Sequence, residues 1–168
     1  MPAATQVSVS EYLNTSYRPD CDYVDGEVVE RNVGEREHSR SQTLTAASLV
    51  AQEKQWGITV LTEQRVQVRP DRYRIPDVCV LAAGAPRERI VTHPPFLCIE
   101  ILSREDTMSR TLERIEDYLA MGVPHVWVID PWRRHGYHYT REGMQEAKDG
   151  VLRTSNPDLV LALAALFE

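Results

Sequence analysis

Two acidic residues lie inside otherwise apolar segments of the sequence. Asp77 is in "YRIPDVCVL" and Glu100 is in "FLCIEIL", and both segments are typical of β-strands. An unpaired carboxylate is costly to bury, so each needs a partner. If neighbouring strands pointed both carboxylates the same way, the two would repel each other unless a hard cation such as Mg²⁺ or Mn²⁺ lay between them. The pair therefore favours a metal site with Asp77 and Glu100 as ligands.

A second explanation of the same two residues stays open. Each carboxylate could be held by an arginine or by backbone N–H groups, with no metal present. For Asp77 alone, which follows Pro76, this explanation is the simpler one. The sequence thus leaves a metal site and a buried charged cluster as alternatives.

The pattern around these residues predicts an α/β fold, with a mixed β-sheet flanked by helices. Asp25-Gly26, between two short extended runs, predicts a hairpin. Ser103 and Asp106 have the form of a capping box that opens a helix. The predicted helices cover about 10–13, 38–56 and 104–121, the last with a buried stripe of Leu112, Ile115 and Leu119. The predicted strands cover about 58–68, 73–81, 96–102 and 125–130, followed by edge strands within 136–154.

Composition limits the class of protein. The chain has 168 residues, 42% of them hydrophobic and 26% charged, which predicts a single domain over residues 1–168. The formal charge of −6 argues against a protein that coats DNA, although it leaves a nucleic-acid enzyme possible. The three cysteines (Cys21, Cys79 and Cys98) lack metal-binding spacing and predict buried thiols. With no membrane span or signal segment, we expect a cytoplasmic protein.

Four segments carry a resemblance to a known family. They are "IPDVCVL", "PFLCIEILSRED", "RIEDYLAMGVPHVWVIDP" and, near the C-terminus, "DLVLALAALF". Together they resemble the Uma family of restriction-endonuclease-like proteins, which carry the PD-(D/E)XK nuclease fold. The resemblance extends from the hairpin near Asp25-Gly26 to the end of the chain, and the third segment is its most specific part.

The resemblance implies a set of roles. Asp77 would be the motif aspartate and Glu100 the acid that follows it, and the two would bind Mg²⁺ or Mn²⁺ together with the backbone carbonyl of Ile101. The implied activity is endonucleolytic hydrolysis of DNA phosphodiester bonds. A homodimer is implied as well, because a small domain needs two active sites to cut both strands of a duplex.

The sequence departs from the commonest form of that superfamily. A lysine usually stands two residues after the glutamate, where this chain has Leu102. The family resembles a variant whose lysine lies on the next helix, four residues before a tyrosine; here the tyrosine is Tyr118 and the matching position is Arg114. An arginine can hold a phosphate or stabilise a transition state, but it cannot act as a general base. The competing hypothesis is that Arg114 only neutralises the acids, in an inactive nuclease fold that serves as a binding module.

Other candidates carry a weaker signal. His38 follows Glu37 at the start of a predicted helix and matches a histidine position of the family, so it could contact phosphate or metal. Glu63 lies on the polar side of a predicted strand and could be a third acid. The segment "WRRHGYHY" mixes cations with aromatic rings, which could stack on bases, although an exposed edge strand has the same composition.

Overall fold

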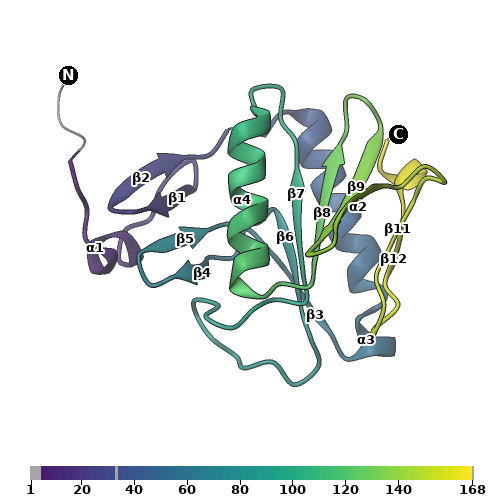
Figure 1. Ribbon diagram of the computed structural model, residues 1–168, viewed down its shortest axis with the longest axis horizontal. Helices are drawn as coiled ribbons and strands as arrows, with labels where there is room; N and C mark the ends of the chain where they lie inside the picture. The colour runs from purple at the N-terminus through teal and green to yellow at the C-terminus, as the bar shows by residue number, and fades with distance from the viewer. Residues whose placement is uncertain (1–4, 33, 168) are drawn as a thin grey trace.

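The computed structural model describes residues 5–32 and 34–167. Its centre is a six-stranded mixed sheet with the order β10-β9-β8-β7-β6-β3 (Figure 1). β7 and β8 are parallel, and every other neighbouring pair in this sheet is antiparallel. The strands are β3 (Thr59–Thr62), β6 (Val78–Leu81), β7 (Leu97–Ile101), β8 (His125–Asp130), β9 (His135–Thr140) and β10 (Gly143–Glu146).

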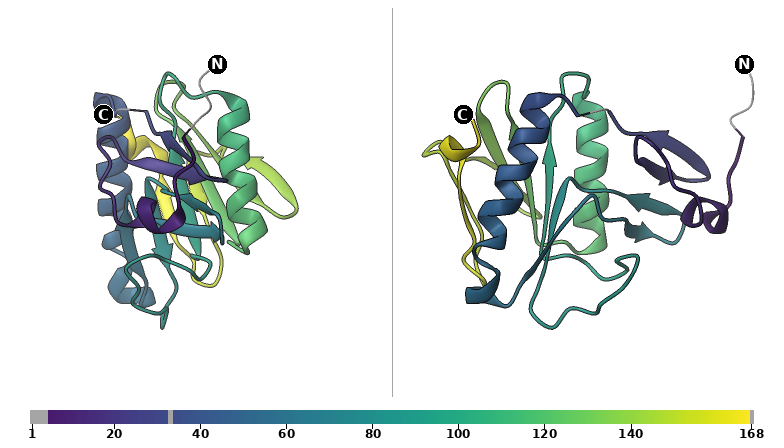
Figure 2. Two further views of the ribbon diagram at one scale, coloured as in Figure 1. Left: turned by 90° about the vertical axis from the view of Figure 1, so that its left-hand side faces the viewer. Right: turned by 180° about the vertical axis from the view of Figure 1, so that it is seen from behind.

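Helices cover the two faces of this sheet, so the molecule has three layers (Figure 2). One face packs against α2 (Arg36–Val50), the hairpin of β11 (Val151–Arg153) and β12 (Val160–Ala162), and the 3-10 turn η1 (Leu163–Leu166). The other face packs against α4 (Met108–Met121), which connects β7 to β8. All five residues of β7 are buried, because this strand lies between the two layers.

A second, four-stranded sheet lies beside α4 with the order β2-β1-β5-β4 (Figure 1). Its strands are β1 (Cys21–Val24), β2 (Glu27–Glu30), β4 (Val66–Arg69) and β5 (Arg72–Arg74), and α1 (Val9–Leu13) packs on it. The predicted hairpin is confirmed as β1 and β2, with left-handed backbone at Asp25 (φ 50°) and Gly26 (φ 95°).

Two predicted strands are wrong in extent. Residues 58–68 form β3 and β4, and residues 73–81 contain β5 and β6, and in both cases the two strands belong to different sheets. The first break falls at Glu63, whose φ of 50° lies in the left-handed region that a strand cannot contain. The N–H of Glu63 donates to the carbonyl of Asp77 (3.2 Å), so the residue that follows β3 lies next to the residue that precedes β6.

The predicted start of α4 is wrong, whereas its predicted buried stripe is confirmed at Ile115, holds partly at Leu119 and is wrong at Leu112. The helix begins at Met108 and its N-cap is Thr107, whose Oγ1 accepts from the N–H of Arg110 (3.3 Å). The buried residues are Thr111, Ile115 and Tyr118, whereas Leu112 is 37% exposed. The buried side of α4 differs from the predicted one because Tyr118 turns toward Glu100 of the sheet. The hydrogen bond between these two residues fixes the orientation of the helix.

The remaining elements agree more closely with the prediction. The expected helix over 38–56 is α2 followed by α3 (Glu53–Trp56), and it ends at Gly57 with φ 66°. β8 is buried on both faces as expected, but β9 lies inside the sheet because β10 pairs with its outer side. All three cysteines are buried free thiols. Within the described residues, no helix is long and apolar enough to span a membrane.

A histidine pair on β8 and β9 predicts a pH dependence of stability. Nδ1 of His125 and Nε2 of His138 are 2.9 Å apart, and burial lowers the pKa of both rings from 6.5. The unfolded chain therefore binds protons at a pH where the folded chain does not. The stability contributed by the neutral pair is complete above pH 6.5 and is lost as the pH falls below that value.

We expect the melting temperature to fall between about pH 7.5 and about pH 5.5, and to fall less in a His125→Gln, His138→Gln double variant. Calorimetry at both pH values measures this difference. An equal fall in the two proteins would show that the histidine pair does not contribute.

Candidate active site

The register of β6 and β7 brings the two acidic residues together. Cys79 pairs with Cys98 in this antiparallel ladder, and two residues further along the same register sets Asp77 opposite Glu100. Both side chains point to the α4 side of the sheet because they alternate with residues buried under α2. Asp77 is 3% exposed and Glu100 is 1% exposed, so both carboxylates are buried as the sequence predicted.

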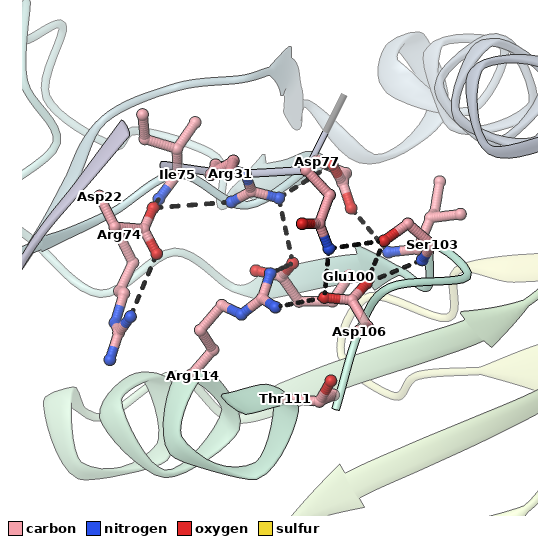
Figure 3. A network of polar contacts seen from close by, with 12 residues as sticks. Asp22, Arg31, Arg74, Ile75, Asp77, Glu100, Ser103, Asp106, Thr111 and Arg114 are labelled. Atoms are coloured by element: carbon pink, nitrogen blue, oxygen red, sulfur yellow. Dashed lines mark hydrogen bonds and ion pairs between the residues drawn. The ribbon is translucent and has the colours of Figure 1, made fainter. Parts of the chain in front are cut away.

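A guanidinium lies between the two carboxylates (Figure 3). Nη2 of Arg31 donates to Oδ1 of Asp77 (3.1 Å) and to Oε2 of Glu100 (3.3 Å). Arg31 directly follows β2, so the smaller sheet supplies this cation to the larger one. One positive charge thus separates two acids that would otherwise repel each other.

Glu100 has two further donors on α4. Nη1 of Arg114 donates to Oε2 (3.2 Å), and the hydroxyl of Tyr118 donates to Oε1 (2.6 Å). Arg114 also donates through Nη2 to Oδ1 of Asp106 (2.8 Å). Arg114 and Tyr118 are one helical turn apart, so α4 presents both toward the same carboxylate.

Asp77 is held from two other directions. Its Oδ2 accepts from the backbone N–H of Ile101 (2.7 Å), and its Oδ1 is 3.4 Å from Nε2 of His38 in the first turn of α2. Its backbone carbonyl accepts from the side-chain amide of Gln42 (3.0 Å). Groups from β7, from α2 and from the segment after β2 therefore meet at this residue.

The environment moves the pKa values of the two acids apart. Burial raises the pKa of Glu100, and the nearby Asp77 adds to this while Arg31 and Arg114 oppose it. Burial would also raise the pKa of Asp77, but Arg31, His38 and the N–H of Ile101 together lower it. Burial would lower the pKa of His38, and its contact with Asp77 raises it instead. Asp77 is thus the more acidic of the pair.

Two cavities, of about 180 Å³ and about 520 Å³, open beside this cluster. Arg31, Asn32, His38 and Asp77 line both, whereas Glu100 lies beneath them. Two buried nitrogens there, Nη1 of Arg31 and Nδ1 of His38, have no hydrogen-bond partner among the described residues; Nη1 is a donor, and Nδ1 is a donor when the His38 ring is protonated. The nearest acid to Nη1 is Asp22, at 3.7 Å. Unpaired buried donors favour a ligand rich in acceptor oxygens, such as a phosphate.

The same residues can be tested for fit to a divalent metal. In the described part of the chain, no group of three or more His, Cys, Asp or Glu side chains is arranged to hold a metal ion. Mg²⁺ does not need such a group, since one or two carboxylates, water and substrate phosphate commonly bind it. Asp77 and Glu100 already share one cation, and Ile101 lines the smaller cavity next to them. The donor set fits a hard cation that competes with Arg31.

Four further residues were expected near the site, and they differ in how close they lie to the two carboxylates. His38 and Tyr118 contact the carboxylate pair directly. Glu63 lines the larger cavity; its backbone N–H donates to the carbonyl of Asp77, while its carboxylate is linked to the site through Gln42, whose amide lies 3.3 Å from Oε1 of Glu63. Glu37 is in the first turn of α2 and does not line either cavity.

Sequence reasoning did not find several residues of the cluster. The most important is Arg31, and the others are Asn32, Asp106 and Gln42. Asp106 was assigned to a helix cap; its carboxylate does accept from Ser103 (2.7 Å from the N–H), but it also pairs with Arg114 and Asn32. Two buried acids signal that counter-ions exist, yet the chain has 19 basic residues and no local pattern distinguishes Arg31.

Comparison with known proteins agrees with this architecture. The chain matches the family model Uma2, described as "Putative restriction endonuclease", over residues 9–166. The chain therefore belongs to this family. No curated protein sequence matches it.

A solved structure is also similar. It is the crystal structure of "a putative nuclease belonging to DUF820" from Anabaena variabilis ATCC 29413, with a TM-score of 0.82 and 21% sequence identity. The match covers 96% of this chain and 97% of that one. At this identity the likeness shows a shared fold, and the predicted α/β, restriction-endonuclease-like core is confirmed.

The hydrogen bond from Tyr118 to Glu100 can be tested by its effect on stability. Replacing Tyr118 with Phe removes a buried bond to a charged acceptor, and we expect a loss of about 1.5–3 kcal/mol in the free energy of unfolding. Tyr12 is equally buried but donates to the neutral carbonyl of Cys21 (2.7 Å), so Tyr12→Phe should cost only about 0.5–1.5 kcal/mol. Urea unfolding measures both, and a larger loss for Tyr12→Phe would contradict the assignment.

Proposed function

We propose that this protein is a metal-dependent nuclease that hydrolyses phosphodiester bonds of DNA. The observation that carries the proposal is the convergence of Asp77 and Glu100 on one cation position, beside an unpaired guanidinium donor of Arg31 and an unpaired ring nitrogen of His38. Membership of a family described as a restriction endonuclease supports the same reaction class.

In this proposal Asp77, Glu100 and the carbonyl of Ile101 hold Mg²⁺ or Mn²⁺. Such an ion supplies, when bound, a more acidic water and charge stabilisation at the scissile phosphate. The water oxygen forms a bond to phosphorus as the bond from phosphorus to one sugar oxygen breaks, and that sugar oxygen takes up a proton, which leaves a phosphate end and a hydroxyl end.

The cationic side chains bind and orient the phosphate. Arg114 lines the smaller cavity together with Arg110, one turn away on the same side of α4. Arg31 offers a donor to the remaining phosphate oxygens through Nη1, and the protonated His38 ring offers a second one through Nδ1. Arg114 keeps its proton, so it acts by charge and hydrogen bonding, and proton removal from water is left to the carboxylates.

A second candidate function has one observation in its favour. Arg31 and Arg114 already neutralise Asp77 and Glu100, which is the arrangement expected of a nuclease fold that only binds a partner and has no metal. The two candidates differ in whether the carboxylates bind metal at all.

Cleavage is the first test. The purified protein should nick and cut plasmid DNA when Mn²⁺ or Mg²⁺ is added. Asp77→Asn and Glu100→Gln should abolish cleavage, and Arg114→Met should lower the rate by about 100-fold or more because a phosphate donor is lost. Arg114→Lys restores a positive charge and should retain activity.

A matched control is Arg65→Met, since Arg65 is a partly buried arginine that donates to the carbonyls of Leu13 and Thr15, away from the carboxylate pair. Cleavage that survives Asp77→Asn would locate the activity elsewhere or in a contaminant.

We further propose that the protein forms a homodimer, which would supply the two active sites needed to cut both strands of a duplex. Sedimentation of the active protein measures its mass.

Metal binding is a separate test that does not depend on activity. Because Arg31 occupies the shared cation position, Arg31→Met should bind Mn²⁺ more tightly than the wild type, by about tenfold or ~1.4 kcal/mol. Titration calorimetry measures the affinity, with Arg65→Met as the control. No binding to either the wild type or Arg31→Met would favour the second candidate function.

A further inference from the structure

A third cavity, of about 480 Å³, lies on the α4 side of the main sheet. Its lining residues come from the start of α4, from β9 and from the edge strand β10, among others. α4 does not cover these two strands (Figure 1). Ser103 and Asp106 line both this cavity and the smaller cavity beside the carboxylates. The two are therefore opposite sides of one short loop between β7 and α4.

Aromatic and flexible apolar side chains line this third cavity, which we call the aromatic pocket. They are Leu102, Met108, Trp132, Tyr137, Tyr139 and Met144. Met108 is 70% exposed and Met144 is 51% exposed, so apolar surface is left open at the mouth of the pocket. Its volume lies in the range of ligand sites, about 300–1,000 Å³.

Trp132 is held in a defined position with one polar atom unused. Oδ1 of Asp130 accepts from the backbone N–H groups of Trp132 and Arg133, both at 3.0 Å, which fixes the turn. The indole Nε1 of Trp132 is buried and has no acceptor among the described residues. A buried donor without an acceptor is costly, so a ligand with an acceptor atom would satisfy it.

Two arginines lie at the rim of the pocket. Arg104 lies over the ring of Trp132, with 4.1 Å between its guanidinium carbon and the ring centre, and its Nε is 3.7 Å from Oε2 of the exposed Glu35. Arg133 also lines the pocket. The two acids there are already engaged, Asp106 by Arg114 and Asp130 by the turn. The rim thus favours an anionic ligand.

We propose that the aromatic pocket receives one unstacked base of the nucleic-acid strand whose phosphate lies at the carboxylate site. The base would pack on the aromatic rings and accept from Nε1 of Trp132, while Arg104 and Arg133 contact the adjoining phosphates. An apolar peptide could accept from the indole N–H through a backbone carbonyl, but it would offer no anionic group to Arg133. This inference rests on the proposed function and adds a strand-binding subsite to it.

The test measures binding without cleavage. In an Asp77→Asn background, a 12-nucleotide single-stranded DNA is titrated while tryptophan fluorescence is recorded. We expect quenching in the parent and in Trp56→Phe, and its loss in Trp132→Phe, because only Trp132 stacks on a base. Trp132→Ala should weaken strand binding about tenfold or more, as measured by anisotropy.

A variant at an exposed residue separates an effect on strand binding from a loss of folding. Arg133 is exposed, so Arg133→Ala should fold normally, bind more weakly and show a smaller salt dependence, by about 0.7 in the logarithmic slope. Unchanged quenching and affinity in both Trp132 variants would overturn the inference. A change of Trp132→Ala from dimer to monomer, with strand affinity unchanged, would overturn it in favour of an interface between copies.

The failure of this inference is distinguishable from failure of the proposed function. If the wild type cuts DNA and the Trp132 variants bind normally, the nuclease proposal stands and the base pocket is wrong. If the wild type never cuts DNA but Trp132 is quenched by the strand, the pocket stands as part of a binding module. If no strand binds, the pocket proposal is overturned.

Discussion

The structure depends on the neutralisation of two buried carboxylates by one shared guanidinium. Asp77 and Glu100 lie opposite each other under α4, where neither could stay charged alone. Arg31 contacts both, and Arg114 contacts Glu100 from the helix. This requirement explains why the smaller sheet docks at the end of β6 and β7, since the cation arrives with the chain that leaves β2.

The same cluster links stability to chemistry. Removing one partner from a buried ion pair leaves an uncompensated charge, and that typically costs about 3–5 kcal/mol. A site that bound metal and phosphate would exchange these internal contacts for contacts with ligands of the same charge type. Arg31 and His38 already present unpaired nitrogens at the cavity walls, so such an exchange needs no new donors.

The loop between β7 and α4 contacts the carboxylate cluster on one side and the aromatic pocket on the other. Asp106 accepts from Ser103 and from Arg114, which ties the loop to the carboxylate cluster. On its other side, Arg104 stacks on Trp132 at the edge of the aromatic pocket. A strand that crossed this loop would meet the cluster of Arg31, Arg114 and the two carboxylates on one side and aromatic rings on the other.

The sequence by itself determined the segments that form the central strands, the hairpin at Asp25-Gly26 and the presence of two acids inside apolar strands, because strand alternation and turn chemistry are local. Tertiary structure alone decided the break at Glu63, the buried face of α4 and the partners of the acids. Those features arise from contacts between segments far apart in the chain, such as Arg31 with Glu100, 69 residues away. No periodic pattern records which of many arginines will meet a buried acid, since the choice is made by how the layers pack.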